Sequence, residues 1–347
     1  MKKAAIIGVT GYSGIELVRL LLNHPNIRIH SIHSSSQSGV NLAGIYPHLK
    51  NIISDELEDI NISKIANEVD LVFIATPSGI SSKIIPELLQ YEVKIIDLSG
   101  DYRLNNPNTY EKWYKHPAPA QEDINKAIYG LTEWNKEDIR NCRFISNPGC
   151  YPTATLLGLA PLVKSKLIDE RSIVTDAKSG VSGAGKSLSR VTHFVETNDN
   201  LTIYKVNQHQ HIPEIEQVLS IWNENIPFIT FNTHLVPMTR GIMATTYANA
   251  NKSVGSTEQL VDLYKTTYED SHFVRVREPG NFPGTKEVYG TNYCDIGIAY
   301  DNRTGRITVV SVIDNLMKGA AGQAVQNANL MFDFDERAGL DHIPIYI

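Results

Sequence analysis

The sequence predicts an α/β fold in two parts, a parallel sheet covered by helices and then an α+β domain with a mixed, largely antiparallel sheet. The chain has 347 residues, more than one typical hydrophobic core needs, so two domains are expected. Up to about residue 149, near-continuous apolar runs alternate with helical patterns, as in parallel strands buried on both faces. Later segments alternate apolar and polar residues, as antiparallel strands do.

Composition excludes several classes of protein. Apolar residues make up 42% and charged residues 20%, which is typical of a globular protein. A net charge of -6 without a basic stripe argues against nucleic-acid binding. No stretch approaches the roughly 20 apolar residues of a membrane span, and the N-terminus shows no secretion signal. Cys142, Cys150 and Cys294 are an odd number at wide spacing, so we expect no disulfide framework, no metal site and a cytoplasmic location.

The N-terminus reads as strand, glycine turn and helix. An apolar run over 4–9 leads into Gly8, Gly11 and Gly14, and an apolar helix pattern follows over 17–22. Closely spaced glycines let a backbone approach a pyrophosphate, and the following helix directs its N-terminus at the anion. We therefore expect a Rossmann-type dinucleotide-binding domain. A purely structural glycine turn is the alternative.

The second expected strand, 27–32, ends in the serine-rich segment 34–38, about 20 residues beyond the last glycine. An NAD-binding domain usually places an acidic residue there to hold the ribose hydroxyl. No Asp or Glu occurs between Glu16 and Asp55, so nothing would repel a 2'-phosphate, and Ser34 and Ser35 offer hydroxyls. The sequence favours NADP(H) over NAD(H). A solvated serine loop is the alternative.

Two further apolar runs, 70–77 and 93–100, flank a helical segment over 80–89. Their carboxyl ends, at Thr76-Pro77 and at Ser99, should line the crevice where doubly wound sheets bind ligands. Arg103 follows closely, so it faces either that crevice or a surface turn.

Cys150 is the candidate nucleophile. It follows a short strand and a Pro-Gly turn, and it precedes Pro152 and an apolar helix pattern. A cysteine at a helix N-terminus is favoured as the thiolate by unpaired amides and the helix dipole. Cys142 and Cys294 lack this setting, and we expect them to be small buried residues.

The segment 180–187, Gly-Val-Ser-Gly-Ala-Gly-Lys-Ser, fits the nucleotide-phosphate loop pattern of NTPases. No clear magnesium-binding strand follows, and the glycine turn of a nucleotide domain already lies at the N-terminus. We therefore expect the loop, with Lys186 as a further candidate, to bind the phosphate or acyl group of a substrate.

His209 and His211 lie two residues apart before a helix expected to start at Pro213, so an extended approach would place both on one face. Either could serve as acid/base near pH 7, with Glu214 orienting one of them; a capping or packing role is the alternative. Arg240 lies between the expected antiparallel strands 228–236 and 242–250. Its guanidinium could bind a substrate carboxylate through two parallel hydrogen bonds, or Arg240 could be a surface residue of a hairpin.

Six stretches carry a family resemblance that covers nearly the whole chain in order. The chain resembles the N-acetyl-gamma-glutamyl-phosphate reductases of arginine biosynthesis, relatives of the aspartate-semialdehyde dehydrogenases. The matching stretches are 8–14 (Gly-Val-Thr-Gly-Tyr-Ser-Gly), 146–153 (Ser-Asn-Pro-Gly-Cys-Tyr-Pro-Thr), 178–185 (Lys-Ser-Gly-Val-Ser-Gly-Ala-Gly), 209–215 (His-Gln-His-Ile-Pro-Glu-Ile), 234–241 (His-Leu-Val-Pro-Met-Thr-Arg-Gly) and 314–323 (Asp-Asn-Leu-Met-Lys-Gly-Ala-Ala-Gly-Gln).

The resemblance implies that NADPH reduces N-acetyl-L-glutamyl 5-phosphate to the 5-semialdehyde through a thioester on Cys150. It also implies that Asn315 neighbours the nicotinamide amide and that a last helix, 316–331, completes the cofactor domain. The alternatives are an aspartate-semialdehyde dehydrogenase, an aminoadipyl-phosphate reductase and, more remotely, an NTPase or a dinucleotide-sensing regulator.

These considerations predict an NADP-binding domain of residues 1–149 and 314–347, and a catalytic, substrate and oligomerisation domain of residues 150–313. We expect a homo-oligomer of two or four copies. The cofactor-binding candidates are Gly8, Thr10, Gly11, Tyr12, Ser13, Gly14, Ser34, Ser35, Thr76, Pro77, Ser179, Gly180 and Asn315. The substrate-binding candidates are Ser99, Arg103, Asn147, Ser182, Gly183, Lys186, Glu214 and Arg240, and the catalytic candidates are Cys150, His209 and His211.

Overall fold

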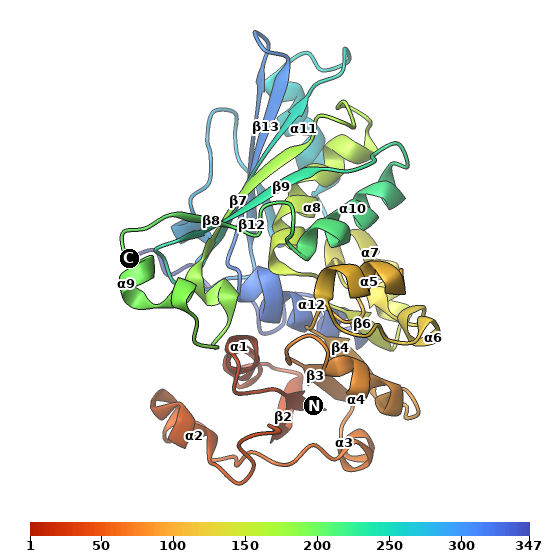
Figure 1. Ribbon diagram of the computed structural model, residues 1–347, viewed down its shortest axis with the longest axis vertical. Helices are drawn as coiled ribbons and strands as arrows, with labels where there is room; N and C mark the ends of the chain where they lie inside the picture. Colours follow the sequence, from red (N-terminus) through yellow and green to blue (C-terminus); the bar gives the residue numbers. More distant parts are fainter. The chain divides into compact units, whose positions relative to one another are not determined.

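The computed structural model describes residues 1–347, which form two compact units (Figure 1). Unit 1 comprises 1–148 and 320–341, and unit 2 comprises 149–319 and 342–347. The chain returns from unit 2 to unit 1 between residues 319 and 320, six residues later than the predicted boundary between 313 and 314. The buried Asp314 carboxylate accepts hydrogen bonds from the backbone N–H groups of Gly290, Leu316 and Met317, which keeps this segment in unit 2. The last residues return to unit 2, where the Ile345 N–H binds the Tyr289 carbonyl.

Unit 1 is built on a six-stranded sheet in the order β2-β1-β3-β4-β6-β5, and all five strand pairs are parallel. The predicted parallel sheet is confirmed. The strand order reverses between β1 and β3, and ligands bind beyond the carboxyl ends of the strands at such a point. The elements are β1 (Lys2–Ile7), α1 (Tyr12–Leu21), β2 (Ile27–His33), α2 (Leu42–Ile45), the 3-10 turn Pro47–Leu49, α3 (Ile62–Glu68), β3 (Leu71–Ile74), α4 (Ser81–Leu88), β4 (Lys94–Asp97), α5 (Pro107–Tyr114), α6 (Gln121–Ile124), β5 (Ile128–Tyr129), α7 (Thr132–Asn141), β6 (Phe144–Ser146) and α12 (Gly322–Met331).

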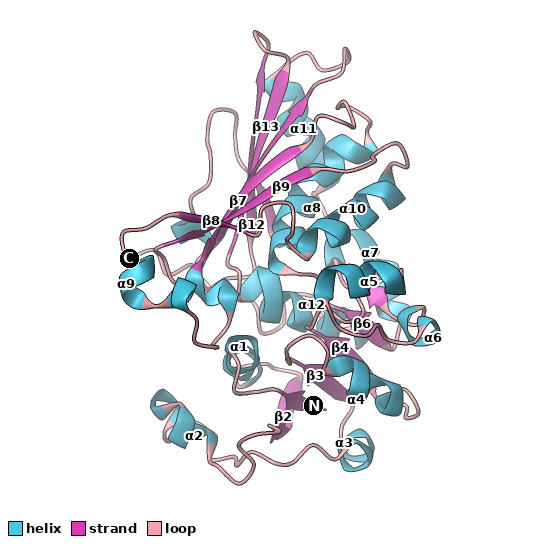
Figure 2. Cartoon of the chain, in the orientation of Figure 1, coloured by secondary structure: helices cyan, strands magenta, loops and turns pink.

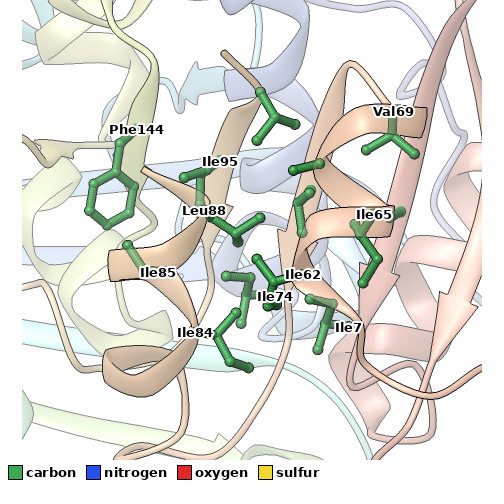
Figure 3. Close-up of a cluster of buried hydrophobic side chains, with 14 of the residues drawn as sticks. Ile7, Ile62, Ile65, Val69, Ile74, Ile84, Ile85, Leu88, Ile95 and Phe144 are labelled. Atoms are coloured by element: carbon green, nitrogen blue, oxygen red, sulfur yellow. The ribbon is translucent and has the colours of Figure 1, made fainter. Parts of the chain in front are cut away.

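The central strands of this sheet are covered on both faces. Every residue of 4–7 and 71–74 is buried, and successive side chains of a strand point to opposite faces. One face packs against α3 and α4 in a cluster of aliphatic side chains closed by Phe144 (Figure 3). The helices α1, α7 and α12 also pack together, so the last helix belongs to this unit. This explains the near-continuous apolar runs of the sequence.

Unit 2 is built on a seven-stranded sheet in the order β11-β12-β13-β10-β7-β9-β8. Four strand pairs are antiparallel and two are parallel, so the predicted mixed, largely antiparallel sheet is confirmed. The elements are α8 (Cys150–Lys164), β7 (Val174–Gly180), the 3-10 turns Val181–Ala184 and Arg190–Thr192, α9 (Phe194–Thr197), β8 (Thr202–Tyr204), α10 (His211–Trp222), β9 (Thr230–Val236), β10 (Ile242–Asn249), α11 (Thr257–Thr267), β11 (Val274–Val276), the 3-10 turn Thr285–Val288, β12 (Cys294–Asp301) and β13 (Arg306–Ile313). A π-helical turn, Met317–Ala321, precedes α12.

The strands on either side of Arg240 do not pair with each other. β7 lies between them, parallel to β9 and antiparallel to β10, so the hairpin alternative for Arg240 is wrong. The turn that joins β9 to β10 passes over the end of β7, where the N–H groups of Val181 and Ser182 bind the carbonyls of Met238 and Thr239.

The helix α8, drawn in Figure 2 beside the strands of unit 2, packs against β10 and β13. It is buried along nearly its whole length. Every residue from Tyr151 to Val163 is buried, which matches a helix that is apolar all round. Pro161 has no N–H to donate to the Leu157 carbonyl, and the Tyr268 hydroxyl donates to that carbonyl instead, at 2.5 Å. The neighbouring Gly158 carbonyl accepts from the Tyr264 hydroxyl of α11. These bonds fix α8 within unit 2. No helix of the structure has the length and apolar character needed to cross a membrane.

Candidate active site

The glycine turn after β1 has a geometry that only glycine allows. Gly8 has φ +85°, and a Cβ there would lie 2.6 Å from the Ala75 carbonyl oxygen. A Cβ on Gly14 would lie 2.5 Å from the Gly8 carbonyl oxygen. Gly11 is the N-cap of α1 and supplies no side-chain cap, so the first amides of the ten-residue helix are not covered by a cap. The turn, with Thr10, Tyr12 and Ser13 partly exposed, fits a pyrophosphate.

The carboxyl end of β3 lies against this turn. Thr76 places its Cγ2 3.2 Å from the position of a Gly8 Cβ. Its Oγ1 is buried and has no hydrogen-bond partner, which is uncommon for a buried hydroxyl. Pro77 is exposed. The glycine turn and Thr76 thus meet at the strand-order reversal, and the orphaned hydroxyl fits a site that binds a polar group.

The serine segment after β2 is bordered by an acidic residue that sequence reasoning missed. Ser34 is buried and its N–H binds the Glu58 carbonyl oxygen at 3.2 Å, whereas Ser35 is exposed. The Glu58 carboxylate pairs with Lys64 at 2.7 Å, and this hydrogen bond lowers the pKa of Glu58. The carboxylate is therefore compensated within its own segment. An isolated parallel β-bridge between His33 and Glu58 brings Glu58 next to Ser34. No local sequence motif predicts this bridge.

Three predicted substrate-binding residues of unit 1 are engaged in its internal bonds. Ser99 is buried, and its Oγ binds the Asp97 carboxylate at 2.9 Å. The Arg103 guanidinium donates to the main-chain carbonyls of Leu98 and Asn147, at 2.9 and 2.8 Å. The Asn147 side chain donates to the Ala320 carbonyl and accepts from Asn327. These contacts give all three a structural role in holding the loops after β4 and β6.

A buried acidic pair lies beside Ser99 and was not predicted. Ser81 Oγ donates to Asp97 and Asp101, both at 3.0 Å. Asp101 also accepts from the Tyr110 hydroxyl and from the Gly79 N–H. Burial first, and then the charge of Asp101, raise the pKa of Asp97 to about 7. The pair anchors the start of α4.

Cys150 is the first residue of α8, with Gly149 as the N-cap. It is partly exposed, whereas the helix is buried from Tyr151 to Val163. The Gly149 N–H donates to Glu214 Oε1 at 2.8 Å, and Thr153 Oγ1 donates to the Gly149 carbonyl at 2.9 Å. Glu214 is fully buried. The carboxylate predicted to orient a histidine therefore holds the turn that carries the cysteine.

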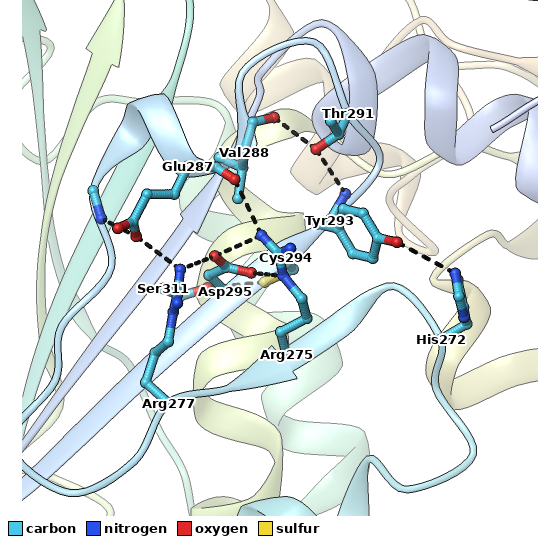
Figure 4. A network of polar contacts seen from close by, with 11 residues as sticks. His272, Arg275, Arg277, Glu287, Val288, Thr291, Tyr293, Cys294, Asp295 and Ser311 are labelled. Carbon is cyan, nitrogen blue, oxygen red and sulfur yellow. Dashed lines mark hydrogen bonds and ion pairs between the residues drawn. The ribbon is translucent and has the colours of Figure 1, made fainter. Parts of the chain in front are cut away.

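Neither of the other two cysteines starts a helix; Cys294 is buried as predicted, whereas Cys142 is only partly buried, contrary to the prediction. Burial raises the pKa of Cys142 to about 11, and its Sγ donates to the Ile139 carbonyl at 3.3 Å. Cys294 is fully buried with its Sγ 3.3 Å from Ser311 Oγ. Figure 4 shows Cys294 beside a polar cluster in which Arg275 and Arg277 bind the buried Asp295 carboxylate at 2.5 to 2.8 Å. This cluster joins β11 to β12 and has no sequence signature.

The two predicted histidines meet beside the first turn of α8. The helix α10 begins at His211 rather than at Pro213, and the ring centroids of His209 and His211 are 4.7 Å apart. Both rings contact Tyr151, the residue after the cysteine, at 5.4 and 6.0 Å between centroids. The His211 N–H donates to His209 Nδ1 at 3.2 Å. Burial first, and then the charge of Lys205, lower the pKa of His209 to about 3, so this ring is neutral with its proton on Nε2.

The loop after β7 does not have the structure of an NTPase phosphate loop. β7 ends at Gly180, a 3-10 turn follows over 181–184, and no α-helix starts at Lys186. Asn315 fixes the loop, because its Oδ1 accepts from the Gly241 N–H at 2.7 Å and its Nδ2 donates to Ser182 Oγ at 2.9 Å. Both ends of the Asn315 amide are thus engaged in unit 2. Ser179 is buried at the end of β7, and Gly183 and Lys186 are exposed.

Arg240 lies in the turn over this loop. Its side chain is 19% exposed, and its Nη1 lies 3.5 Å from the fully buried Asp314 Oδ2. The guanidinium also lies over the Tyr289 ring, 5.9 Å from the centroid. The 3.5 Å contact to Asp314 is longer than the bonds of a bidentate fork-to-fork ion pair.

Two protein-family models match the chain. "Semialdehyde dehydrogenase, NAD binding domain" covers residues 3–142 and "Semialdehyde dehydrogenase, dimerisation domain" covers residues 150–315. The N-acetyl-gamma-glutamyl-phosphate reductase of Geobacillus sp. is 61% identical over 342 residues, and that of Bacillus mycoides is 58% identical over 344 residues. Each alignment covers 99% of both chains.

Solved structures of low sequence identity share the fold. Aspartate semialdehyde dehydrogenase II from Vibrio cholerae has a TM-score of 0.73 at 20% identity, covering 96% of this chain and 99% of the other. Aspartate semialdehyde dehydrogenase with NADP from Candida albicans has a TM-score of 0.67 at 16% identity, covering 96% and 99%. With the family models and the full-length relatives, the chain belongs to the semialdehyde dehydrogenase family and, within it, to the N-acetyl-gamma-glutamyl-phosphate reductases.

Proposed function

We propose that this chain reduces N-acetyl-L-glutamyl 5-phosphate to N-acetyl-L-glutamate 5-semialdehyde, with NADPH as reductant and release of phosphate. One observation carries the proposal: Cys150 is the partly exposed first residue of a helix that is buried from Tyr151 to Val163, and two histidines contact the next residue, Tyr151. The chain is also 61% identical over its length to a reductase of that name. A thiol in this setting is suited to attack an activated acyl group.

The first half of the reaction transfers the acyl group to sulfur. The Cys150 thiolate attacks the carbonyl carbon of the acyl phosphate, and phosphate leaves with the electron pair of the broken C–O bond. The amides at the start of α8 and in the loop after β7 favour the oxyanion that forms on the carbonyl. The thioester that results accepts hydride far more readily than an oxygen ester would.

The second half reduces the thioester. A nicotinamide cofactor, held in unit 1 by the glycine turn and Thr76, would supply the hydride that reduces the thioester carbonyl. The sulfur then leaves with the electron pair of the C–S bond and takes a proton, which regenerates the Cys150 thiol as the aldehyde departs.

We assign the acid/base role to His211. With a pKa of about 3, only about 10⁻⁴ of His209 is protonated at pH 7, so it is a poor proton donor. Its Nδ1 also already accepts a hydrogen bond from the main-chain N–H of His211. His209 is better suited to position His211, whose ring it contacts.

The cofactor preference rests on unit 1. The glycine turn and Thr76 would hold the pyrophosphate, and Ser34 and Ser35 would lie near the adenosine ribose. Because Glu58 is paired with Lys64, it does not leave an uncompensated charge there, and we propose NADP(H) rather than NAD(H). Arg240 is proposed to bind the substrate α-carboxylate.

Assembly is a further part of the proposal. The match of residues 150–315 to a dimerisation domain supports a homo-oligomer of two or four copies, with unit 2 contributing the contact. Light scattering of the purified chain gives the number of copies. The catalytic domain would then be unit 2, residues 149–319 and 342–347. A cytoplasmic location stays a prediction from the sequence.

The test is a phosphate-dependent oxidation assay. The purified chain is given NADP and phosphate with either N-acetylglutamate semialdehyde or aspartate semialdehyde, and NADPH formation is followed. We expect turnover of the acetylated substrate that depends on phosphate. A preference for aspartate semialdehyde would instead support the aspartate-semialdehyde dehydrogenase alternative. Turnover that does not depend on phosphate would contradict a reaction that passes through an acyl phosphate.

A further inference from the structure

A π-helical turn brings a glycine against the candidate nucleophile. Residues Met317–Ala321 form this turn, and the Gly319 N–H donates to the Asp314 carbonyl at 3.0 Å. Such turns inside helices are rare and occur frequently at functional sites. Gly319 and Cys150 belong to the same unit although they lie far apart in the sequence.

The contact between them leaves no room for a side chain. A Cβ built on Gly319 would lie 2.7 Å from Cys150 Cβ and 3.2 Å from Cys150 Cα. Carbon atoms in contact ordinarily lie about 3.5–4.0 Å apart, so the two residues would have to separate by about 0.8 Å or more. The third atom near that position, Ile313 Cδ1 at 3.3 Å, is the end of a side chain and can move.

Cys150 is poorly able to retreat. Its helix is buried from Tyr151 to Val163, and Tyr264 and Tyr268 bind two of its carbonyls. The turn before it is fixed by the bond from Gly149 to Glu214. An added methyl group would therefore displace the first turn of α8, the π-turn, or both.

We infer that Gly319 is a positioning residue, which sets where the Cys150 sulfur lies by allowing the π-turn backbone to pack directly on the cysteine. The inference rests on the proposed role of Cys150 as the nucleophile. A misplacement of about 1 Å at a reacting group can cost on the order of 10²-fold in rate. Substrate and cofactor binding should depend far less on this contact.

The experiment compares Gly319→Ala with a matched glycine-to-alanine control. Gly284→Ala adds the same methyl in unit 2, where no atom lies within 4 Å of the new Cβ and φ is -109°. We expect Gly319→Ala to lower kcat by about 10- to 100-fold, with KM and NADPH affinity within about threefold of the unchanged chain. Gly284→Ala should keep kcat within about threefold.

A second variant makes the test independent of folding. Ile313→Val removes the Cδ1 atom that borders the added methyl, so the π-turn can shift away from Cys150. We expect Gly319→Ala/Ile313→Val to recover at least about threefold in kcat over Gly319→Ala, and Ile313→Val alone to resemble the unchanged chain. If Gly319→Ala does not fold, the double variant is compared with Ile313→Val and should still show the lower kcat with unchanged KM.

The outcomes separate this inference from the proposed function. Rapid-quench mass spectrometry gives the rate at which substrate acylates Cys150 in each variant. An unchanged chain that never acylates Cys150 removes the nucleophile and the inference together. If the unchanged chain acylates Cys150, and every folded variant of Gly319 has the same acylation rate and the same kcat, the inference is wrong but the proposed function stands. A lower melting temperature with unchanged kcat has the same meaning, because it shows a role in stability only.

Discussion

The free energy of unfolding should decrease less in mild acid in His209→Asn than in the unchanged chain. His209 is 4% exposed, and its pKa falls to about 3 in the folded state because burial disfavours the imidazolium. In the unfolded state the pKa is about 6.5. Below pH 6.5 His209 binds a proton in the unfolded chain but stays neutral in the folded chain. The free energy of unfolding therefore decreases as the pH falls from 6.5 toward 3.

The size of the effect follows from the two pKa values. Between pH 7 and pH 5 the single group should lower the free energy of unfolding by about 2 kcal/mol, and by about 1.4 kcal/mol for each further unit until the pH nears 3. The raised pKa of Asp97 makes a contribution of opposite sign, whereas burial also lowers the pKa of His24 and His33, which adds to the loss. Those two residues lie in unit 1, whereas His209 lies in unit 2.

The assay isolates His209 by comparing changes between two pH values. Trp222 lies on α10, so its fluorescence in a Trp113→Phe/Trp134→Phe background reports urea unfolding of unit 2. The change in unfolding free energy from pH 7 to pH 5 should be about 2 kcal/mol smaller in His209→Asn, whatever its absolute stability. His48→Asn, at an exposed histidine, should behave as the unchanged chain. Equal losses in all three chains would refute the neutral buried state of His209 and the reasoning that assigns the acid/base role to His211.

Three other perturbations test the remaining assignments. Ser35→Asp should shift the ratio of kcat/KM with NADPH to that with NADH at least about tenfold toward NADH, because a carboxylate repels the 2'-phosphate; an unchanged ratio places the ribose elsewhere. Arg240→Lys should lower kcat/KM for the acyl substrate about 10- to 100-fold while NADPH binding stays the same, since an ammonium cannot form a bidentate fork; full activity would assign Arg240 to its contacts with Asp314 and Tyr289 alone. Iodoacetamide should label Cys150 first and abolish activity, and alanine at Cys142 or Cys294 should be tolerated; inactivation that tracks another thiol contradicts this order.

Local signals in the sequence were sufficient where the structure is also local. The glycine turn at Gly8 and the helix start at Cys150 each depend on a few consecutive residues, and both form where predicted. The parallel sheet of unit 1 and the mixed sheet of unit 2 follow from hydrophobic patterns of single segments, and both are confirmed. The match of 180–187 to an NTPase loop shows the limit of such motifs, because no helix follows it.

Contacts between distant segments could not be predicted in the same way. Glu214 binds the Gly149 N–H across 65 residues, and Gly319 packs on Cys150 across an even longer stretch of chain. The pairing of β7 between β9 and β10 depends on how a whole sheet assembles, so the strand pattern around Arg240 suggested a hairpin that does not exist. Arg103 binds the Asn147 carbonyl, and the Asn147 side chain binds the Ala320 carbonyl in the π-helical turn, contacts that no local pattern predicts. Their role as substrate ligands stays a prediction.

Trapping of the acyl-enzyme tests the central claim most directly. The chain is mixed with N-acetylglutamyl phosphate in the absence of NADPH, quenched in acid, digested and analysed by mass spectrometry, with Cys150→Ser treated in parallel. We predict an N-acetylglutamyl adduct on the Cys150 peptide alone, which disappears when NADPH is added and never forms in Cys150→Ser. An active enzyme that shows no adduct, or carries it on another residue, would contradict the thioester mechanism.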